Sequence, residues 1–244
     1  MWEGAAHSAI ISLREETRGG SQMGLFRRLP GMPKYIYSEK ESLELEEYVT
    51  KTFGEFKYAI HELISPDIHL DILVVEPTEE EPFYKLVTYG AGAYKMPVPR
   101  AYRKYASRYA EYVINIPKDW DTKNSAPEDY WPIRVLKEVG RIPVSCRTWL
   151  GFGHTTQSDE AGSAYAPDTK LNSVVLDYAL DKELDRASLQ MSSGRKVDFY
   201  QVIPLYPEEL KLKMDNNAEA ILDKLDEEFD DYRLISKDRK NVCL

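Results

Sequence analysis

The sequence predicts an α+β fold, in which a mixed and largely antiparallel β-sheet is flanked by a few helices. Most apolar segments are short and are bounded by Gly, Pro or Asn, as is typical of strands. Between residues 32 and 206 only two segments have helical spacing, and they do not alternate with strands as a regular βαβ repeat requires. Two further helices with an acidic outer face are predicted beyond Pro207.

The first helix is predicted by its ends and its spacing. Ser38 and Glu41 form a capping box, and Gly54 supplies a stop. Between them, three apolar residues recur every four positions: Leu45, Val49 and Phe53. The second helix is predicted to open at Asp129 and to end at Gly140 and Pro143.

Seven segments have the composition and spacing of strands. They are residues 55–64, 67–75, 84–92, 108–116, 170–178, 186–191 and 196–206. In residues 67–75 apolar and polar residues alternate at first, and the end is apolar on both faces, which predicts a central strand. The C-terminal helices follow, the second with Ala218, Ile221, Leu222, Leu225 and Phe229 on one side.

Composition restricts the class of function. With 43% hydrophobic residues in 244, the chain can bury a large core without disulfides. The net charge of −9 disfavours direct binding of nucleic acid and favours a basic protein partner. Residues 208–231 hold ten of the acidic side chains against three lysines, which predicts a solvated outer face or a surface for such a partner. Two distant cysteines, with no secretory signal or membrane span, predict a cytoplasmic protein.

Candidates for metal binding or catalysis are few. The possible zinc ligands are His61, His69, Asp71, Cys146 and His154, of which only the His69-x-Asp71 pair has a suitable spacing. Hydrogen-bonded side chains explain this pair more simply, and no metal or cofactor is predicted. The enzymatic alternative is a nucleophilic Cys146 thiolate that His154 activates as a base. The default interpretation is that Cys146 is a buried and inert thiol. The G-x-G pairs at 90–92 and 151–153 lack the context of a phosphate-binding loop.

The segment Trp149–Thr156 is interpreted as a strand and turn that Gly151 and Gly153 flatten on one face. That face packs internally or receives a peptide, and His154 is expected to be a hydrogen-bonding anchor rather than a base. A second candidate contact patch lies around Arg100–Tyr112, where Tyr102 and Tyr105 accompany several basic residues.

Seven ordered blocks resemble the Suppressor-of-fused domain family, in particular its bacterial members. They are SPDIHLDILVVEPT, LVTYGAGAYKMPVP, EYVINIPKDW, YWPIRVLKEVGRIP, TWLGFGHTT, DTKLNSVVL and VDFYQVIPLYPEEL. The resemblance covers residues 35–214. We therefore expect a flexible tail over residues 1–31 and one domain over 32–244, with a helical extension at 215–244. An ordered helix over Ala5–Glu16 is the alternative for the tail.

The resemblance implies a protein-binding domain with no catalytic residues and no cofactor. The animal relative clasps an extended peptide, and by position the corresponding contacts here are Ile142, His154, Thr155, Thr156, Gln157, Ser158 and Asp159. Bacterial members resemble immunity proteins, or antitoxins, encoded beside polymorphic toxins that are often nucleases. The sequence therefore predicts a non-enzymatic protein that neutralises a cognate toxin by direct binding. The alternative is an intracellular scaffold domain that captures a peptide and is unrelated to toxins.

Overall fold

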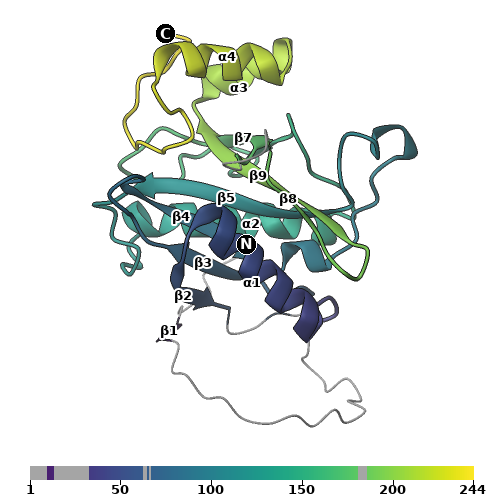
Figure 1. Ribbon diagram of the computed structural model, residues 1–244. Coiled ribbons are helices and arrows are strands. Elements are labelled where there is room, and N and C mark those ends of the chain that lie inside the picture. Colours follow the sequence, from purple (N-terminus) through teal and green to yellow (C-terminus); the bar gives the residue numbers. More distant parts are fainter. Residues whose placement is uncertain (1–9, 14–32, 63–64, 66, 181–185) are drawn as a thin grey trace.

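The computed structural model describes residues 10–13, 33–62, 65, 67–180 and 186–244. One nine-stranded sheet organises them, in the order β1-β2-β3-β4-β5-β9-β7-β6, with β8 also paired to β9. Only β5 and β9 are parallel, and every other pair is antiparallel. The predicted mixed, largely antiparallel α+β fold is confirmed (Figure 1).

The strands are β1 (Ile10–Leu13), β2 (Phe56–His61), β3 (Asp71–Val75), β4 (Phe83–Tyr89), β5 (Tyr109–Pro117), β6 (Thr155–Gln157), β7 (Ser173–Tyr178), β8 (Ser188–Gln190) and β9 (Lys196–Leu205). The helices are α1 (Glu39–Phe53), α2 (Pro127–Ser145), α3 (Pro207–Asp215) and α4 (Ala218–Glu228), with 3-10 turns η1 (Ala91–Ala93) and η2 (Arg100–Tyr102). Each of the seven predicted strand segments overlaps one of these strands, and β4 and β5 each extend one residue beyond the predicted segment.

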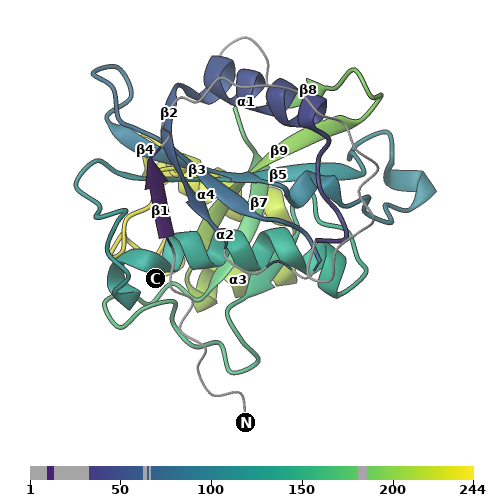
Figure 2. The ribbon, with the colours of Figure 1, turned by 90° about the horizontal axis from the view of Figure 1, so that it is seen from below.

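Strand β3 is buried on both faces, as its sequence predicts. Ile72 and Val74 pack in the cluster that contains α2, whereas Leu73 and Val75 pack in the cluster that contains α1. Because successive side chains of a strand point to opposite faces, α1 and α2 must cover opposite faces of the sheet. Figure 2 shows the central strands between these two helices. The strand itself begins only at Asp71, later than the predicted residue 67.

Helix α1 forms where its caps predict it. The Ser38 hydroxyl accepts from the Glu41 N–H at 3.3 Å, and the Glu41 carboxylate accepts from the Ser38 N–H at 3.0 Å. Gly54 ends the helix at φ 115°, a conformation that favours glycine. The apolar side of α1 is buried.

Helix α2 differs from the prediction at both ends, because it begins at Pro127 and continues through Gly140 and Pro143 to Ser145. Gly140 is not a stop. A Cβ there would lie 2.9 Å from Leu70 Cδ2, so the missing side chain lets the helix approach the chain before β3. Burial of Val139, Gly140 and Pro143 outweighs the local preference of glycine and proline to end a helix.

The two predicted C-terminal helices are present as α3 and α4, and they lie together at one end of the molecule (Figure 1). Ala218, Ile221, Leu222 and Leu225 pack on β7 and β9. The chain after α4 returns to α3, where Arg239 donates to the fully buried Glu209 at 2.7 Å and to the Pro204 carbonyl at 2.8 Å. This buried pair joins the C-terminal segment to the sheet.

Residues 1–31, where a tail or a helix is expected, are described only at Ile10–Leu13. These four residues form β1, which pairs antiparallel with β2. The rest of that range lies outside the described residues, and the domain boundary at residue 32 stays a prediction. Within the described ranges, every helix is too short or too polar to cross a membrane.

Candidate functional site

Among the strands that the structure describes, β6 is one edge of the sheet and pairs with β7 alone. The Leu176 N–H donates to the His154 carbonyl at 2.9 Å, and the Ser158 N–H donates to the Asn172 carbonyl at 2.9 Å. In an antiparallel pair such bonds recur at every second residue. The main-chain groups of Thr155 and Gln157 therefore point away from β7, toward the open edge.

The prediction that Gly151 and Gly153 lie in a flattened strand is wrong. The strand begins only at Thr155, and the two glycines belong to the turn before it. Gly153 adopts φ 75°, which suits a turn and not a strand. A Cβ on Gly151 would lie 3.3 Å from both the Trp149 ring and the Tyr200 hydroxyl, so this glycine lets the turn pack closely on the core.

The expectation that His154 is a hydrogen-bonding anchor is confirmed. Its Nδ1 accepts from the Gly151 N–H at 2.9 Å, which closes the turn. Burial lowers the pKa of His154, and the positive charge of Lys213 lowers that pKa further, so the imidazole is neutral at pH 7. A neutral ring with one nitrogen already used as an acceptor holds the turn in position ahead of β6.

An aromatic row joins the two surface patches that the sequence pointed to separately. The Trp149 and His154 rings meet edge to face, with centroids 4.3 Å apart. Trp149 also contacts Tyr102, with ring centroids 5.4 Å apart. Tyr102 is 52% exposed. The structure therefore brings together Tyr102 and His154, which lie far apart in the sequence.

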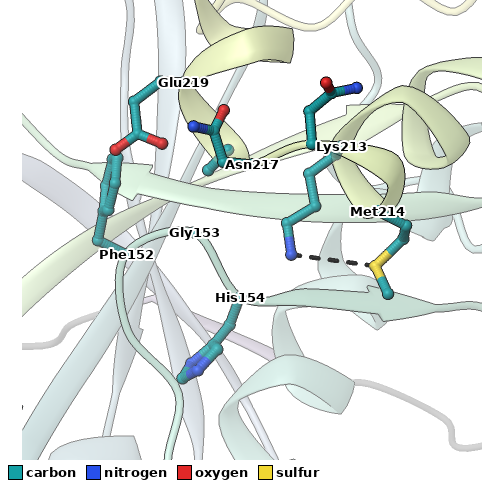
Figure 3. Close-up of a pocket in the computed structure, with 9 residues that line it drawn as sticks. Phe152, Gly153, His154, Lys213, Met214, Asn217 and Glu219 are labelled. Carbon is teal, nitrogen blue, oxygen red and sulfur yellow. Dashed lines mark hydrogen bonds between the residues drawn. The ribbon is translucent and has the colours of Figure 1, made fainter.

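A shallow pocket lies between the turn before β6 and the turn that joins α3 to α4 (Figure 3). Its volume is about 340 Å³. Lys213 and Met214 extend from α3 toward the strand that follows His154, and the imidazole points away from them. Met214 is 64% exposed, and its sulfur lies 3.9 Å from the Thr155 hydroxyl. The pocket thus offers an apolar side chain and a cation directly beside the open edge.

Sequence reasoning missed the residues that α3 and α4 contribute to this pocket. They are Lys213, Met214, Asn216, Asn217, Ala218 and Glu219. The helical spacing of α3 and α4 predicts which side of each helix packs on the core. It does not show that the turn between the two helices will lie beside the turn that precedes β6. The consecutive Asn216 and Asn217 were the available local signal that the helix is interrupted here.

The other candidate residues are more dispersed. Tyr105 is 57% exposed and has Lys104 over its ring at 4.4 Å. Ile142 is half-buried in the last turn of α2, and among the described residues no hydrogen bond, ion pair or ring contact joins it to β6. Ser158 and Asp159 follow β6 in a loop, where Asp159 accepts from the Ser163 N–H at 2.9 Å.

The expectation of a buried, inert Cys146 is wrong in its burial. The thiol lies at the C-terminal end of α2 and is exposed. The helix ends with the Cys146 N–H bonded to the Ile142 carbonyl at 2.9 Å, which leaves the side chain outside the core. His154 contacts the Trp149 ring and the Gly151 N–H, and within the described part of the chain no hydrogen bond joins it to Cys146.

The zinc candidates separate into two places. His61, His69 and Asp71 converge beside β2 and β3, whereas His154 lies beside β6 at the other side of the sheet order. A hydrogen bond to Asp71 raises the pKa of His69. Burial opposes ionisation of Asp71, but hydrogen bonds from His69, from the Glu62 N–H and from His61 outweigh it and lower the pKa of Asp71. The pair is thus hydrogen-bonded, as expected.

The acidic C-terminal surface is present in the fold. Of the ten acidic residues in 208–231, nine are exposed and Glu209 alone is buried. Arg100, Arg103 and Lys104 are exposed on η2 and just after it, beside Tyr102. Of the acidic residues in 208–231, Glu219 lines the pocket beside β6, together with Lys213.

Comparisons with known proteins agree on one family. The family model "Suppressor of fused protein (SUFU)" matches residues 66–240. A protein of Neisseria gonorrhoeae FA 1090, described as a SUFU homologue, has a similar structure at TM-score 0.57 and 14% identity, over 82% of this chain and 96% of that one. No curated protein sequence matches this chain significantly.

Two further solved structures share the fold. Drosophila Suppressor of Fused matches at TM-score 0.59 and 13% identity, over 86% of this chain and 52% of that one, so this chain spans about half of the Drosophila protein. A chain of the Sufu–Fu complex matches at TM-score 0.56 and 13% identity, over 83% of this chain and 90% of that one. At these identities the likeness describes the fold.

Proposed function

This chain belongs to the Suppressor of fused family, and we propose that it is a non-enzymatic protein-binding domain that captures an extended peptide segment along strand β6. One structure with the same fold was solved as a Sufu–Fu complex, so a relative with this fold forms a complex with another protein. The single observation that supports the choice of β6 is its open edge.

Strand addition requires unpaired main-chain groups in a straight row, and β6 presents them. The outward N–H and C=O groups of Thr155 and Gln157 are spaced as an added antiparallel or parallel strand needs. Main-chain hydrogen bonds supply affinity in this mode, whereas pockets for alternate side chains supply specificity. The Tyr102–Trp149 row and the Met214 pocket border the edge and are suited to that second role.

We assign the partner contacts accordingly. Thr155, Gln157 and their neighbours Thr156, Ser158 and Asp159 form the docking edge, and His154 holds its start in place. Tyr102 and Tyr105 are the exposed aromatic anchors beside it. Ile142 is assigned to the periphery, because it is half-buried at the end of α2.

We further propose that the partner is a basic protein, namely a cognate nuclease toxin that this chain neutralises as an immunity protein. A nuclease must be basic to hold nucleic acid, and the acidic face of α3 and α4 is complementary to such a surface. By covering the groove in which the toxin binds nucleic acid, this chain would inhibit the toxin without catalysing a reaction itself. A peptide-capturing scaffold unrelated to toxins is the other outcome that the tests below distinguish.

The docking edge is tested by one proline. Gln157→Pro removes an outward-pointing N–H and keeps the bonds to β7, since proline is tolerated on edge strands. The chain is co-expressed with the protein encoded beside its gene, and affinity is measured for the purified pair. We expect Gln157→Pro to weaken binding about tenfold, near the upper end of the typical worth of one hydrogen bond, ~0.5–1.5 kcal/mol.

Gln157→Ala is the matched control, because it changes the same side chain and keeps the N–H. It is expected to bind within about twofold of the wild type. Both variants must unfold at the wild-type temperature. Equal binding by all three proteins would exclude β6 as the docking edge, and an encoded neighbour that does not bind at all would exclude the toxin as partner.

A further inference from the structure

Two histidines and one aspartate converge where β2 ends and β3 begins. His61 is the last residue of β2, and Asp71 is the first residue of β3. His61 Nδ1 lies 2.8 Å from Asp71 Oδ2, and His69 Nε2 lies 3.2 Å from the same oxygen. The three ligand atoms lie within 4.8 Å of one another.

These separations are close to those of a metal site. Around a tetrahedral Zn²⁺ ion, with bonds of about 2.0–2.1 Å, neighbouring ligand atoms are roughly 3.3 Å apart. Both histidine-to-Asp71 separations are already near this value. The ligand atoms of the two histidines lie within 4.8 Å of each other, so an ion between the three groups would draw the two imidazoles together by up to about 1.5 Å. Two imidazoles and one carboxylate are also a donor set that suits zinc and its neighbours in the first transition row.

A second layer of hydrogen bonds orients the ligands. Asp71 Oδ1 accepts from the Glu62 N–H at 3.0 Å, which leaves Oδ2 directed at the histidines. On the far side of the His69 ring, Nδ1 lies 3.3 Å from the Ser65 hydroxyl. A metal-bound histidine commonly donates its other N–H to such a partner, which fixes the ring and its tautomer.

The second layer ends in a partly buried charge pair. The Ser65 hydroxyl donates to Glu62 Oε2 at 2.6 Å, and Glu62 is in turn paired with Arg141 of α2. Arg141 also pairs with Asp67. His69 is therefore connected through Ser65 and Glu62 to a helix of the core, which makes its position rigid before any ion arrives.

The site is open on one side. The side chain of Asp71 is 7% exposed, whereas those of His61 and His69 are 43% and 34% exposed. Three protein ligands with a solvent-facing side leave room for water or for one ligand from a partner. An ion there would crosslink the end of β2 to the start of β3.

We propose that His61, His69 and Asp71 form a binding site for one divalent transition-metal ion, of which Zn²⁺ fits best. The ion closes the chain between β2 and β3 and stabilises the fold. The site lies on the opposite side of the strand order from β6, so this inference does not depend on the proposed peptide binding.

The proposal is tested by titrating chelator-treated protein with ZnCl₂ and measuring the binding by calorimetry. We expect one Zn²⁺ per chain and a rise in unfolding temperature with added zinc, because an ion that binds only the folded state stabilises it. His69→Ala and His61→Gln are each expected to weaken binding by more than about 100-fold. Ser65→Ala should weaken it roughly tenfold, as for other outer partners of a metal ligand.

His154→Ala is the matched control, since it removes a histidine outside the cluster and should leave zinc affinity unchanged. Replacement by Co²⁺ gives a readout on the wild type itself: a visible spectrum of nitrogen and oxygen ligands, without the near-ultraviolet band of a thiolate, excludes Cys146 and Cys243. A wild type that does not bind stoichiometric zinc would overturn the proposal. So would His61→Gln and His69→Ala proteins that are folded, by circular dichroism, and bind zinc like the wild type.

Discussion

At the scale of single residues, the most unusual environment is that of Glu111, a fully buried carboxylate in β5. It accepts hydrogen bonds from five donors: the Tyr37 hydroxyl at 2.8 Å, the Thr88 hydroxyl at 2.5 Å, and the N–H groups of Gly90, Ala91 and Gly92 at 3.0, 3.3 and 3.0 Å. These bonds join β4, β5 and the segment before α1. Burial raises the pKa of Glu111 to about 7, although the hydrogen bonds oppose the shift.

A raised pKa in the folded state makes stability depend on pH. Below pH 4.5 Glu111 is protonated in both states, and between pH 4.5 and about 7 the folded state binds more protons than the unfolded state. The unfolding free energy contributed by Glu111 therefore falls as pH rises through this range, by roughly 3 kcal/mol in total. Urea unfolding of the wild type and of Glu111→Gln at pH 5 to 8 measures it as the difference between the two proteins.

The Gln variant cannot ionise, so the wild type should lose its advantage over this variant as pH rises. At pH 5 the wild-type carboxyl is protonated and presents one hydrogen to the five surrounding donors, whereas the NH₂ group of Gln presents two. We therefore expect Glu111→Gln to be less stable at pH 5 by about 2 kcal/mol. Glu227→Gln, at an exposed position, should follow the wild-type curve. A difference between wild type and Glu111→Gln that is constant with pH would contradict the raised pKa.

At the scale of elements, the turn from β4 into η1 depends on close contact between backbones. Gly90 has φ 123°, and a Cβ there would lie 1.8 Å from the His69 carbonyl oxygen. In the sequence this G-x-G pair resembles a weak phosphate-binding signal. In the fold its first glycine lets the chain before β3 pass across the end of β4.

Gly90→Ala is expected to lower the unfolding free energy by at least ~3 kcal/mol, because both backbone strain and a steric clash oppose it. The matched control is Gly194→Ala, which has φ 87° but no heavy atom within 4 Å of the new Cβ. That change should cost only about 1–2 kcal/mol, for the strain alone. Denaturant unfolding compares the two, and an equal loss of stability would mean that the contact with His69 is unimportant.

At the scale of the whole molecule, the net charge of −9 predicts how the chain meets its partner. Attraction between an acidic protein and a basic one accelerates encounter and is screened by salt. We expect the association rate constant with the co-purified partner to fall at least tenfold between about 0.05 and 0.5 M salt. Stopped-flow mixing measures this, and a rate that does not change with salt would remove the electrostatic part of the proposal.

The location of the charge is tested by two variants with the same change in net charge. Glu227→Gln/Asp230→Asn neutralises two exposed residues in and just after α4. Glu79→Gln/Glu80→Gln neutralises two exposed residues between β3 and β4, far from β6 in the strand order. The first pair should reduce the salt dependence more than the second, because nearby charges dominate when salt is present.

Much of the element structure could be predicted because it depends on neighbours in the sequence. The Ser38–Glu41 box and the Gly54 stop are contacts within a few residues, so they define α1 before any packing occurs. The end of α2 could not be predicted in this way, since Leu70, which lies in a different part of the sequence, is what makes Gly140 a packing residue rather than a stop. The same holds for the turn before β6, where distant Tyr200 decides how close Gly151 must lie.

By itself, the sequence determined the α+β class, most of the strands and helices, the acidic C-terminal face and the likeness to the Suppressor of fused family, because periodicity, capping and composition act locally or add over the chain. Only the tertiary structure decided which strand is an open edge, that Tyr102 and His154 share one surface, and that His61 joins His69 and Asp71. These depend on strand order and on contacts between distant segments, and the hydrophobic pattern of a strand is the same whether its neighbour is present or not.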